Sequence, residues 1–188
     1  MSERHSVCPW WLGYLLVNPL RRLIEPPERL LGPFVRPGMT VVEPGCGMGY
    51  FSLPLARLVG PGGKVVCVDL QEKMIAGLLR RARPARLADR IVAFVPSEHD
   101  LGLARFAAAA ELAVALHMVH EVPNQRRFLE QMREVLRPGG LLLLVEPRGH
   151  VTVEAFEQTL AAAEQLGFRR TGRPVSGRGH GAALEKLA

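Results

Sequence analysis

The sequence predicts an α/β fold, in which a mostly parallel sheet is covered by helices on both faces. Two observations support this prediction. Short apolar runs typical of buried strands alternate along the chain with segments of helical periodicity, which is the pattern of strand–helix–strand units. The first of these runs also opens into a glycine-rich loop, as expected where a strand turns sharply into a helix beside a ligand. With 188 residues and 48% apolar content, the chain is long enough for one domain with a single sizeable core.

The glycine-rich loop follows an apolar run that begins at Thr40 and ends in the acidic Glu43. Its glycines have G-x-G-x-G spacing, whereas the dinucleotide fingerprint G-x-G-x-x-G needs its third glycine where Tyr50 stands. A carboxylate just before the loop would repel a pyrophosphate, but it can attract a ligand with an ammonium group, directly or through water. This disfavours NAD and favours S-adenosylmethionine; a tight turn without any ligand is the structural alternative. The loop glycines are Gly45, Gly47 and Gly49.

A second apolar run, Lys64–Val68, is followed by Asp69, which stands 20 positions after Gly49. A ribose-binding acid is expected at about this position. A carboxylate at the end of a strand can accept hydrogen bonds from both ribose hydroxyls, with assistance from its charge. The alternative is a structural role, in which Asp69 caps the helix that begins near Glu72.

Two further stretches complete a set of motifs. Leu116–Val122 carries two histidines after the fourth expected strand, and Leu136–Gly140 is a turn before the fifth. With the loop region that starts at Arg36 and with Val68–Asp69, they make the chain resemble the class I (Rossmann-like) S-adenosylmethionine-dependent methyltransferases, over roughly residues 28 to 146. The resemblance implies a Rossmann-like, seven-stranded, mostly parallel sheet with helices on both faces and an antiparallel C-terminal strand pair.

The remaining elements follow the alternation of apolar runs and helical segments. Gly167 marks the end of the last helix, and the tail after it suits the strand pair that closes the sheet of the family. After Asp69 we expect, in chain order, a helix over Glu72–Arg83, strands over Ile91–Val95 and Glu111–Leu116, a helix over Gln125–Leu136, a strand over Leu141–Glu146, a helix over Val153–Leu166, and strands over Phe168–Val175 and Ala182–Leu187.

The resemblance also implies which residues hold the cofactor, S-adenosylmethionine. Glu43 and the loop glycines would surround its methionine portion, Asp69 would bind the ribose, and Leu70 would flank the adenine. In the loop after the third strand, Glu98 would accept a hydrogen bond from the adenine amino group. The carbonyl of Leu116 or His117 would lie near the cofactor ammonium. The full set of expected cofactor-binding residues is Glu43, Gly45, Cys46, Gly47, Gly49, Asp69, Leu70, Ser97, Glu98 and Leu116.

Attack on a sulfonium methyl group needs a nucleophile held close and in line, so orientation alone can supply most of the acceleration. If a general base takes part, the loop after the fourth strand is its expected source, because open α/β folds bind ligands at the carboxyl ends of their strands. We expect His117 first and His120 next. In the alternative reading either imidazole hydrogen-bonds a helix terminus or Glu121.

An alternative to general-base catalysis is a metal site at the same edge of the sheet. Five possible metal ligands follow the fourth and fifth expected strands, namely His117, His120, Glu121, Glu146 and His150. The His-x-x-His-Glu order is not a standard zinc spacing, and no cysteine pair assists it. We therefore predict no metal.

The N-terminal segment concentrates Trp10, Trp11 and Tyr14 just ahead of the core. We interpret residues 1–35 as a helical lid, 36–147 as the cofactor-binding core, and 148–188 as the C-terminal helix and closing strands of one methyltransferase domain. Packing of the segment on the core is one alternative, and docking on a membrane surface through the two tryptophans with Arg21 and Arg22 is another. The apolar stretch over residues 7–20 is broken by prolines well short of the roughly 20 residues that a membrane span requires.

Composition limits the partners and the compartment. The net charge of +6 could attract RNA, but the basic clusters near Arg80 and Arg169 have no interleaved aromatic residues, so nucleic acid is a less favoured partner. The three cysteines have no C-x-x-C spacing, which favours a reducing, cytoplasmic setting. The function that we expect is methyl transfer to a small-molecule acceptor. The alternatives are a non-catalytic S-adenosylmethionine-binding protein, a methyltransferase acting on RNA or protein, and an NAD-linked oxidoreductase; oligomeric state is not predicted.

Overall fold

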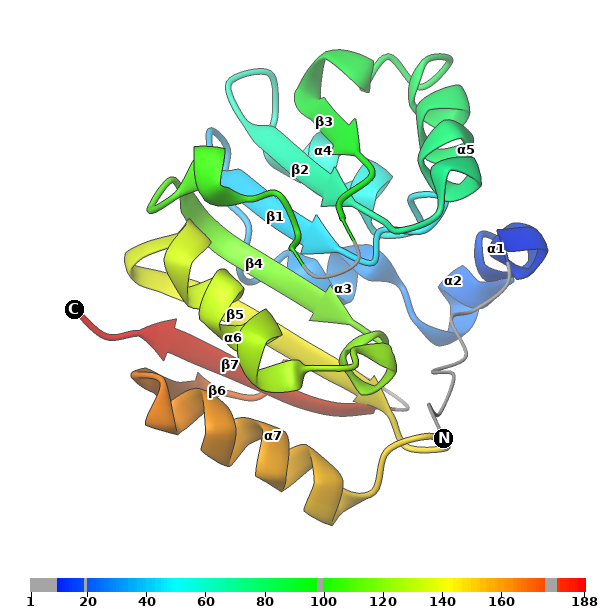
Figure 1. The fold of residues 1–188 in the computed structure, drawn as a ribbon. Coiled ribbons are helices and arrows are strands. Elements are labelled where there is room, and N and C mark those ends of the chain that lie inside the picture. The colour runs from blue at the N-terminus through cyan, green and yellow to red at the C-terminus, as the bar shows by residue number, and fades with distance from the viewer. Residues whose placement is uncertain (1–9, 19, 98–99, 175–178) are drawn as a thin grey trace.

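The computed structural model describes residues 10–18, 20–97, 100–174 and 179–188. Its centre is a seven-stranded sheet with the strand order β3-β2-β1-β4-β5-β7-β6 (Figure 1). The pairs among the first five strands are parallel, and β7 runs antiparallel to both β5 and β6. The predicted fold class is therefore confirmed. The strands are β1 (Thr40–Pro44), β2 (Lys64–Val68), β3 (Ile91–Phe94), β4 (Ala110–Leu116), β5 (Leu136–Pro147), β6 (Phe168–Gly172) and β7 (Gly179–Lys186).

Two hydrophobic layers enclose the sheet, one on each face. Successive strand residues point to opposite faces, so Val41 belongs to one layer and Val42 to the other. The first layer joins the sheet to α3, α4 and α5, and the second joins it to α6 and α7. In Figure 1, α6 lies in front of the sheet and α7 lies along its lower edge. The helices are α1 (Gly13–Leu16), α2 (Arg21–Ile24), α3 (Pro27–Leu31), α4 (Ser52–Leu58), α5 (Glu72–Ala82), α6 (Gln125–Val135) and α7 (Val153–Gln165), with 3-10 turns η1 (Trp10–Leu12), η2 (Ala88–Arg90), η3 (Ala104–Phe106) and η4 (Val119–Glu121).

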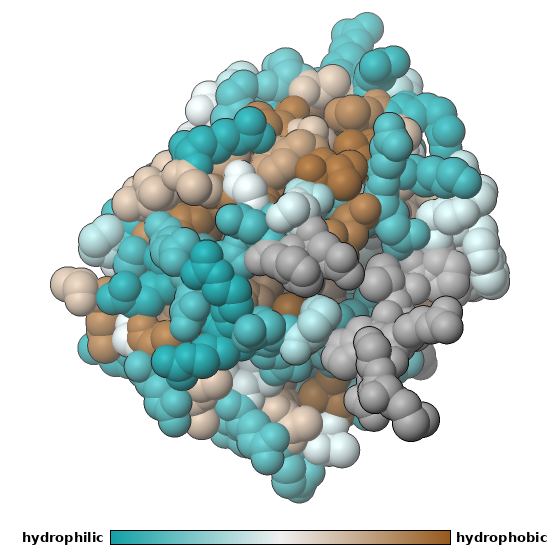
Figure 2. All heavy atoms as spheres, viewed as in Figure 1, coloured by the Kyte–Doolittle hydropathy of each residue, from teal (hydrophilic) through white to brown (hydrophobic). Residues whose placement is uncertain are grey.

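Helix α6 illustrates how the sequence specifies these layers. The Asn124 side chain caps its first turn by accepting a hydrogen bond from the Arg127 N–H at 2.9 Å. Phe128 and Met132, four residues apart, are buried against the sheet, while the outer face carries charged residues. Figure 2 shows mostly hydrophilic residues over this face of the molecule, with hydrophobic residues visible between them.

The predicted element ends agree with the structure to within a few residues, and two of the differences have clear physical reasons. The turn expected at Leu136–Gly140 is a bulge inside β5, because Leu136 pairs with Ala110 and Leu141 pairs with Leu112. The strand expected over Phe168–Val175 ends at Gly172, shortly before Pro174, which has no N–H to donate to a strand ladder.

The last strand begins at Gly179 rather than at Ala182, since its glycines pair with the long β5 up to Pro147. Within the described ranges, no helix combines the length and the apolar character that crossing a membrane requires.

Candidate functional site

A cavity of about 1200 Å³ lies where the carboxyl ends of β1, β2, β4 and β5 meet. Its walls come from the glycine loop, from the residues that follow β2 and β4, and from an N-terminal stretch between Val17 and Glu25. A site for one small ligand typically measures roughly 300–1,000 Å³. The cavity therefore has room for a nucleoside cofactor and a second, smaller molecule.

Two glycines of the loop serve different purposes. Gly47 lines the cavity with a φ of +54°, and a Cβ at this position would meet none of the described heavy atoms within 4 Å. A ligand can therefore lie directly against its backbone. Gly49 has a φ of +81°, and a Cβ there would stand 2.3 Å from Leu78 Cδ1 in α5. Gly49 thus lies behind the cavity wall and allows α5 to pack on the loop, while Gly45 and Cys46 line the cavity with Gly47.

Asp69 fixes the shape of this loop. Its Oδ2 accepts a hydrogen bond from the Gly47 N–H at 2.9 Å, and its Oδ1 accepts one from the Gln71 N–H at 2.9 Å. Burial raises the pKa of Asp69, and the two backbone hydrogen bonds oppose that rise. An ionised carboxylate has about four acceptor positions, so these two bonds leave capacity for a ligand. Asp69 and the half-exposed Leu70 both line the cavity, as expected for a ribose and adenine site.

Glu43 does not line the cavity, in contrast to the loop that follows it. Its side chain is 3% exposed and lies beneath the loop, where the Cys67 thiol donates to Oε2 at 3.9 Å. Burial raises the pKa of Glu43 to about 8, so the carboxyl is largely neutral at neutral pH. The side chain of Glu43 therefore does not face the cavity directly, and its role toward the cofactor ammonium stays a prediction.

Two more of the expected cofactor-binding residues, Leu116 and Ser97, also line the cavity. Leu116 ends β4, and the Ser97 hydroxyl accepts a hydrogen bond from the Asp100 N–H at 3.1 Å. Glu98 lies outside the described residues.

His117 joins the core to the N-terminal stretch. It has a φ of +60°, and its Nε2 lies 2.7 Å from Glu25 Oε1. Glu25 also pairs with Arg21 at 2.9 Å, and its carbonyl accepts a hydrogen bond from the Tyr50 hydroxyl at 2.7 Å. Burial alone would raise the pKa of Glu25, but His117 and Arg21 outweigh burial and lower it. These contacts hold the stretch against one wall of the cavity. Trp10 and Tyr14 do not line the cavity but contact Lys73 and Arg80 of α5, so a lid stays a prediction.

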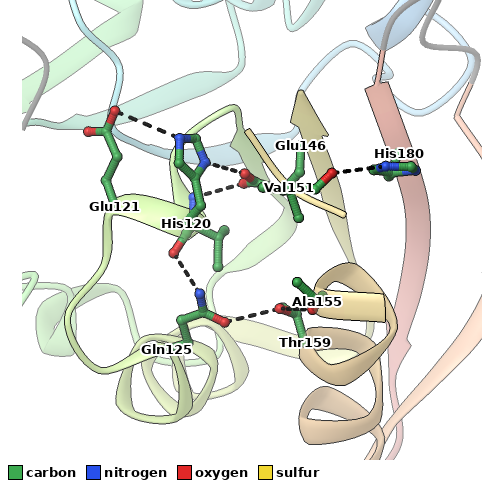
Figure 3. A network of polar contacts seen from close by, with 9 residues as sticks. His120, Glu121, Gln125, Glu146, Val151, Ala155, Thr159 and His180 are labelled. Atoms are coloured by element: carbon green, nitrogen blue, oxygen red, sulfur yellow. Dashed lines mark hydrogen bonds and ion pairs between the residues drawn. The ribbon is translucent and has the colours of Figure 1, made fainter. Parts of the chain in front are cut away.

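His120 contacts a buried carboxylate at the end of β5. Its Nδ1 bonds Glu146 Oε2, and Glu146 Oε1 accepts a hydrogen bond from the Val119 N–H at 2.8 Å (Figure 3). Glu146 is only 3% exposed. Glu121 Oε1 lies 4.0 Å from His120 Nε2, and the His150 ring centre lies 5.6 Å from that of His120. Sequence reasoning considered Glu146 only as a metal ligand and missed this pairing.

Of the residues weighed as metal ligands, His117 lies apart, whereas Glu121, Glu146 and His150 lie around His120. His117 turns toward Glu25, whereas His120 turns toward Glu146. Among the described residues, no three histidine, cysteine, aspartate or glutamate side chains are arranged to hold a metal ion.

Comparison with known proteins identifies the family to which this site belongs. A family model described as a methyltransferase domain matches residues 36–171, most of the chain. The chain belongs to this methyltransferase family. The crystal structure of an S-adenosylmethionine-dependent methyltransferase from Aquifex aeolicus covers 96% of this methyltransferase and 100% of its own chain, with a TM-score of 0.85 and 23% identity. At the level of the family, the predictions of a class I methyltransferase and of S-adenosylmethionine as cofactor are confirmed.

The relatives differ in what they do. The nocamycin O-methyltransferase of Saccharothrix syringae is 32% identical over 129 residues, which are 68% of this chain and 42% of the relative. The S-adenosyl-L-methionine-dependent Diels-Alderase of Talaromyces variabilis is 27% identical over 173 residues, 90% of this chain and 57% of the relative. The methyltransferase thus spans only about half of the length of each of these curated relatives.

Proposed function

We propose that this protein transfers the methyl group of S-adenosylmethionine, by in-line attack, to a small-molecule acceptor. The observation that carries the proposal is that Gly47, Asp69 and His120 all line one continuous cavity. Its volume of about 1200 Å³ accommodates two molecules in contact with each other. Holding two reactants in contact and aligned is the main requirement of this reaction.

The cofactor side of the cavity is the glycine loop with the residues after β2 and β3. We expect Asp69 to bind the ribose, Leu70 and Ser97 to border the adenine with Glu98, and the loop with Leu116 to hold the methionine portion. Bound S-adenosylmethionine supplies an electrophilic methyl group on its sulfonium sulfur. Because Glu43 is buried beneath the loop, we expect it to stabilise the loop rather than to contact the cofactor directly.

The cavity lining as a whole is mostly apolar, and we expect Ile24, Phe51, Met118 and Phe128 to contact the acceptor. This lining favours a partly apolar organic molecule. The N-terminal stretch that contacts His117 forms part of the cavity wall, and we expect it to disfavour a folded RNA or protein as acceptor. The nocamycin and ubiquinone-biosynthesis O-methyltransferases among the relatives support a small acceptor. The free, buried thiols of Cys46 and Cys67 are compatible with the cytoplasmic setting, which stays a prediction.

The test measures S-adenosylhomocysteine formed from S-adenosylmethionine in the presence of separate cellular fractions: metabolites of low molecular mass, RNA, and protein. The proposal predicts turnover with the metabolite fraction. Turnover only with RNA or protein would contradict the small-molecule acceptor. Cofactor binding without S-adenosylhomocysteine from any fraction would favour the alternative, a protein that uses bound S-adenosylmethionine without methyl transfer, as the relationship to a Diels-Alderase allows.

A further inference from the structure

The contact between His120 and Glu146 determines which imidazole nitrogen carries a proton. Glu146 Oε1 accepts a hydrogen bond from the Val119 N–H at 2.8 Å, and Glu146 Oε2 faces His120 Nδ1. An ionised carboxylate can only accept, so the neutral imidazole must donate from Nδ1. Its lone pair is then on Nε2, the nitrogen that points away from Glu146 in Figure 3.

A second set of hydrogen bonds holds the backbone that carries His120. The Val119 carbonyl accepts from Gln125 Nε2 at 3.2 Å, and Gln125 Oε1 accepts from the Thr159 hydroxyl at 3.0 Å. Figure 3 shows this chain of contacts running from the His120 turn through α6 to α7. The His120 turn is therefore fixed from two sides, by β5 and by two helices, and a fixed ring is what proton transfer requires.

We propose that His120 Nε2 is the general base that removes a proton from a hydroxyl group of the acceptor, and that Glu146 is its positioning residue. The inference rests on the proposed function and narrows the acceptor to a hydroxyl compound, such as a phenol or an enol. A neutral amine already offers a lone pair, whereas a hydroxyl becomes a strong nucleophile only when it loses its proton.

The proton balance is simple. The O–H bond of the acceptor breaks, the proton binds Nε2, and the electron pair left on oxygen forms the bond to the methyl carbon while the pair of the carbon–sulfur bond stays on sulfur. Among the described residues, the charged and titratable groups that face the ring are Glu146, Glu121 and His150. Glu121, 4.0 Å from Nε2, stabilises the imidazolium before its proton passes to solvent.

His117 is less suited to act as the general base, although the sequence favoured it over His120 for this role. Its Nε2 is engaged by Glu25 at 2.7 Å, and its Nδ1 is buried without a hydrogen-bond partner among the described residues. Its ring therefore serves the N-terminal stretch.

Glu146→Gln is the most specific variant, because it keeps the shape of the side chain. The Val119 N–H needs an acceptor, so the amide oxygen of the glutamine stays on it and the amide NH₂ group faces His120 Nδ1. Nδ1 must then accept, and the proton moves to Nε2, which can no longer act as a base. We expect cofactor affinity to be retained and turnover to fall roughly 10²–10⁴-fold, the range that general-base catalysis supplies.

Two readouts test the proposal. Ring ¹⁵N chemical shifts, recorded at about pH 8 where an ordinary imidazole is neutral, should show His120 protonated on Nδ1 in the wild type and on Nε2 in Glu146→Gln. Turnover is measured with phenol and with para-nitrophenol, which is already ionised at this pH. His120→Gln should reduce methylation of phenol far more than that of para-nitrophenol. His180→Gln is the matched control, because His180 bonds the Val151 carbonyl at 3.1 Å and does not line the cavity.

The outcomes separate this inference from the proposed function. A folded wild-type protein that binds no S-adenosylmethionine defeats the proposed function itself. If it binds the cofactor but carries the His120 proton on Nε2, or if His120→Gln and Glu146→Gln keep wild-type turnover, the base assignment is wrong. Methylation of aniline or thiophenol, but of neither phenol, would overturn the hydroxyl acceptor. The tautomer measurement needs no acceptor and can overturn the proposal by itself.

Discussion

Replacing Gly49 by alanine should destabilise the fold without direct interference in the cavity. The residue has a φ of +81°, a conformation that costs an L-residue about 1–2 kcal/mol. A Cβ at this position would also stand 2.3 Å from Leu78 Cδ1, and overpacking of a core costs about 1–3 kcal/mol. Together the two effects predict a loss of about 2–5 kcal/mol in the free energy of unfolding.

Urea unfolding of Gly49→Ala measures this loss, and Gly47→Ala is the matched control. Gly47 has a φ of +54°, but its Cβ would project into open space, so only the conformational cost of about 1–2 kcal/mol applies. Gly47→Ala should instead weaken S-adenosylmethionine binding, because the new methyl group projects where the ligand approaches the loop.

A double-mutant cycle isolates the clash. Leu78→Ala removes the atoms that the new Cβ would meet, so the combination with Gly49→Ala should be more stable than the sum of the two single losses predicts. A Gly49→Ala protein that unfolds at the wild-type urea concentration, or a cycle with no coupling, would refute the packing role of this glycine.

Three further predictions concern buried charge, the N-terminal stretch and a helix cap. Because the pKa of Glu43 is raised from 4.5 to about 8, the free energy of unfolding of the wild type should fall as the pH rises between these values. Glu43→Gln lacks this titration, so its stability relative to the wild type, measured by urea unfolding, should increase by roughly 3–5 kcal/mol at most from about pH 5 to about pH 8. An unchanged stability difference between the two proteins would contradict the raised pKa of Glu43. Because the pKa of Glu25 is lowered from 4.5, its carboxylate contributes to stability above that pH, and the contribution is lost as the pH falls through the lower folded value. Hydrogen-exchange protection of α2 should therefore drop in acid, and also in Glu25→Gln at neutral pH. Equal protection of α2 in the variant and the wild type at neutral pH would contradict the claim that Glu25 holds the N-terminal stretch. Asn124→Ala should cost about 0.5–2 kcal/mol by loss of the α6 cap, measured as a lower melting temperature against the distant surface control Arg173→Ala.

The parts of the site that could be predicted are those encoded locally. An apolar run followed by an acid predicted both β2 and the position of Asp69, and the glycine spacing predicted the loop before α4. Each of these features depends on residues close together in the chain. The division of labour between Gly47 and Gly49 was not predicted, because it depends on how α5 packs against the loop.

The pairings that distinguish the two histidines could not be predicted, because they join distant parts of the chain. His120 meets Glu146 only through the register that places Leu116 beside Val145 in the sheet. His117 meets Glu25 across 92 positions of sequence. The burial of Glu43 beneath the loop is likewise a consequence of packing. Sequence pattern therefore located the rim of the cavity, and tertiary contacts decided what each side chain does there.

A calorimetric titration of the folded protein with S-adenosylmethionine tests the central claim most directly, with NAD as comparator and Asp69→Ala as the site variant. The account predicts saturable binding of one S-adenosylmethionine per chain, strong weakening in Asp69→Ala, and no binding of NAD. A folded wild-type protein that binds no S-adenosylmethionine, or that binds it equally well without the Asp69 carboxylate, would contradict the cofactor site described for this cavity.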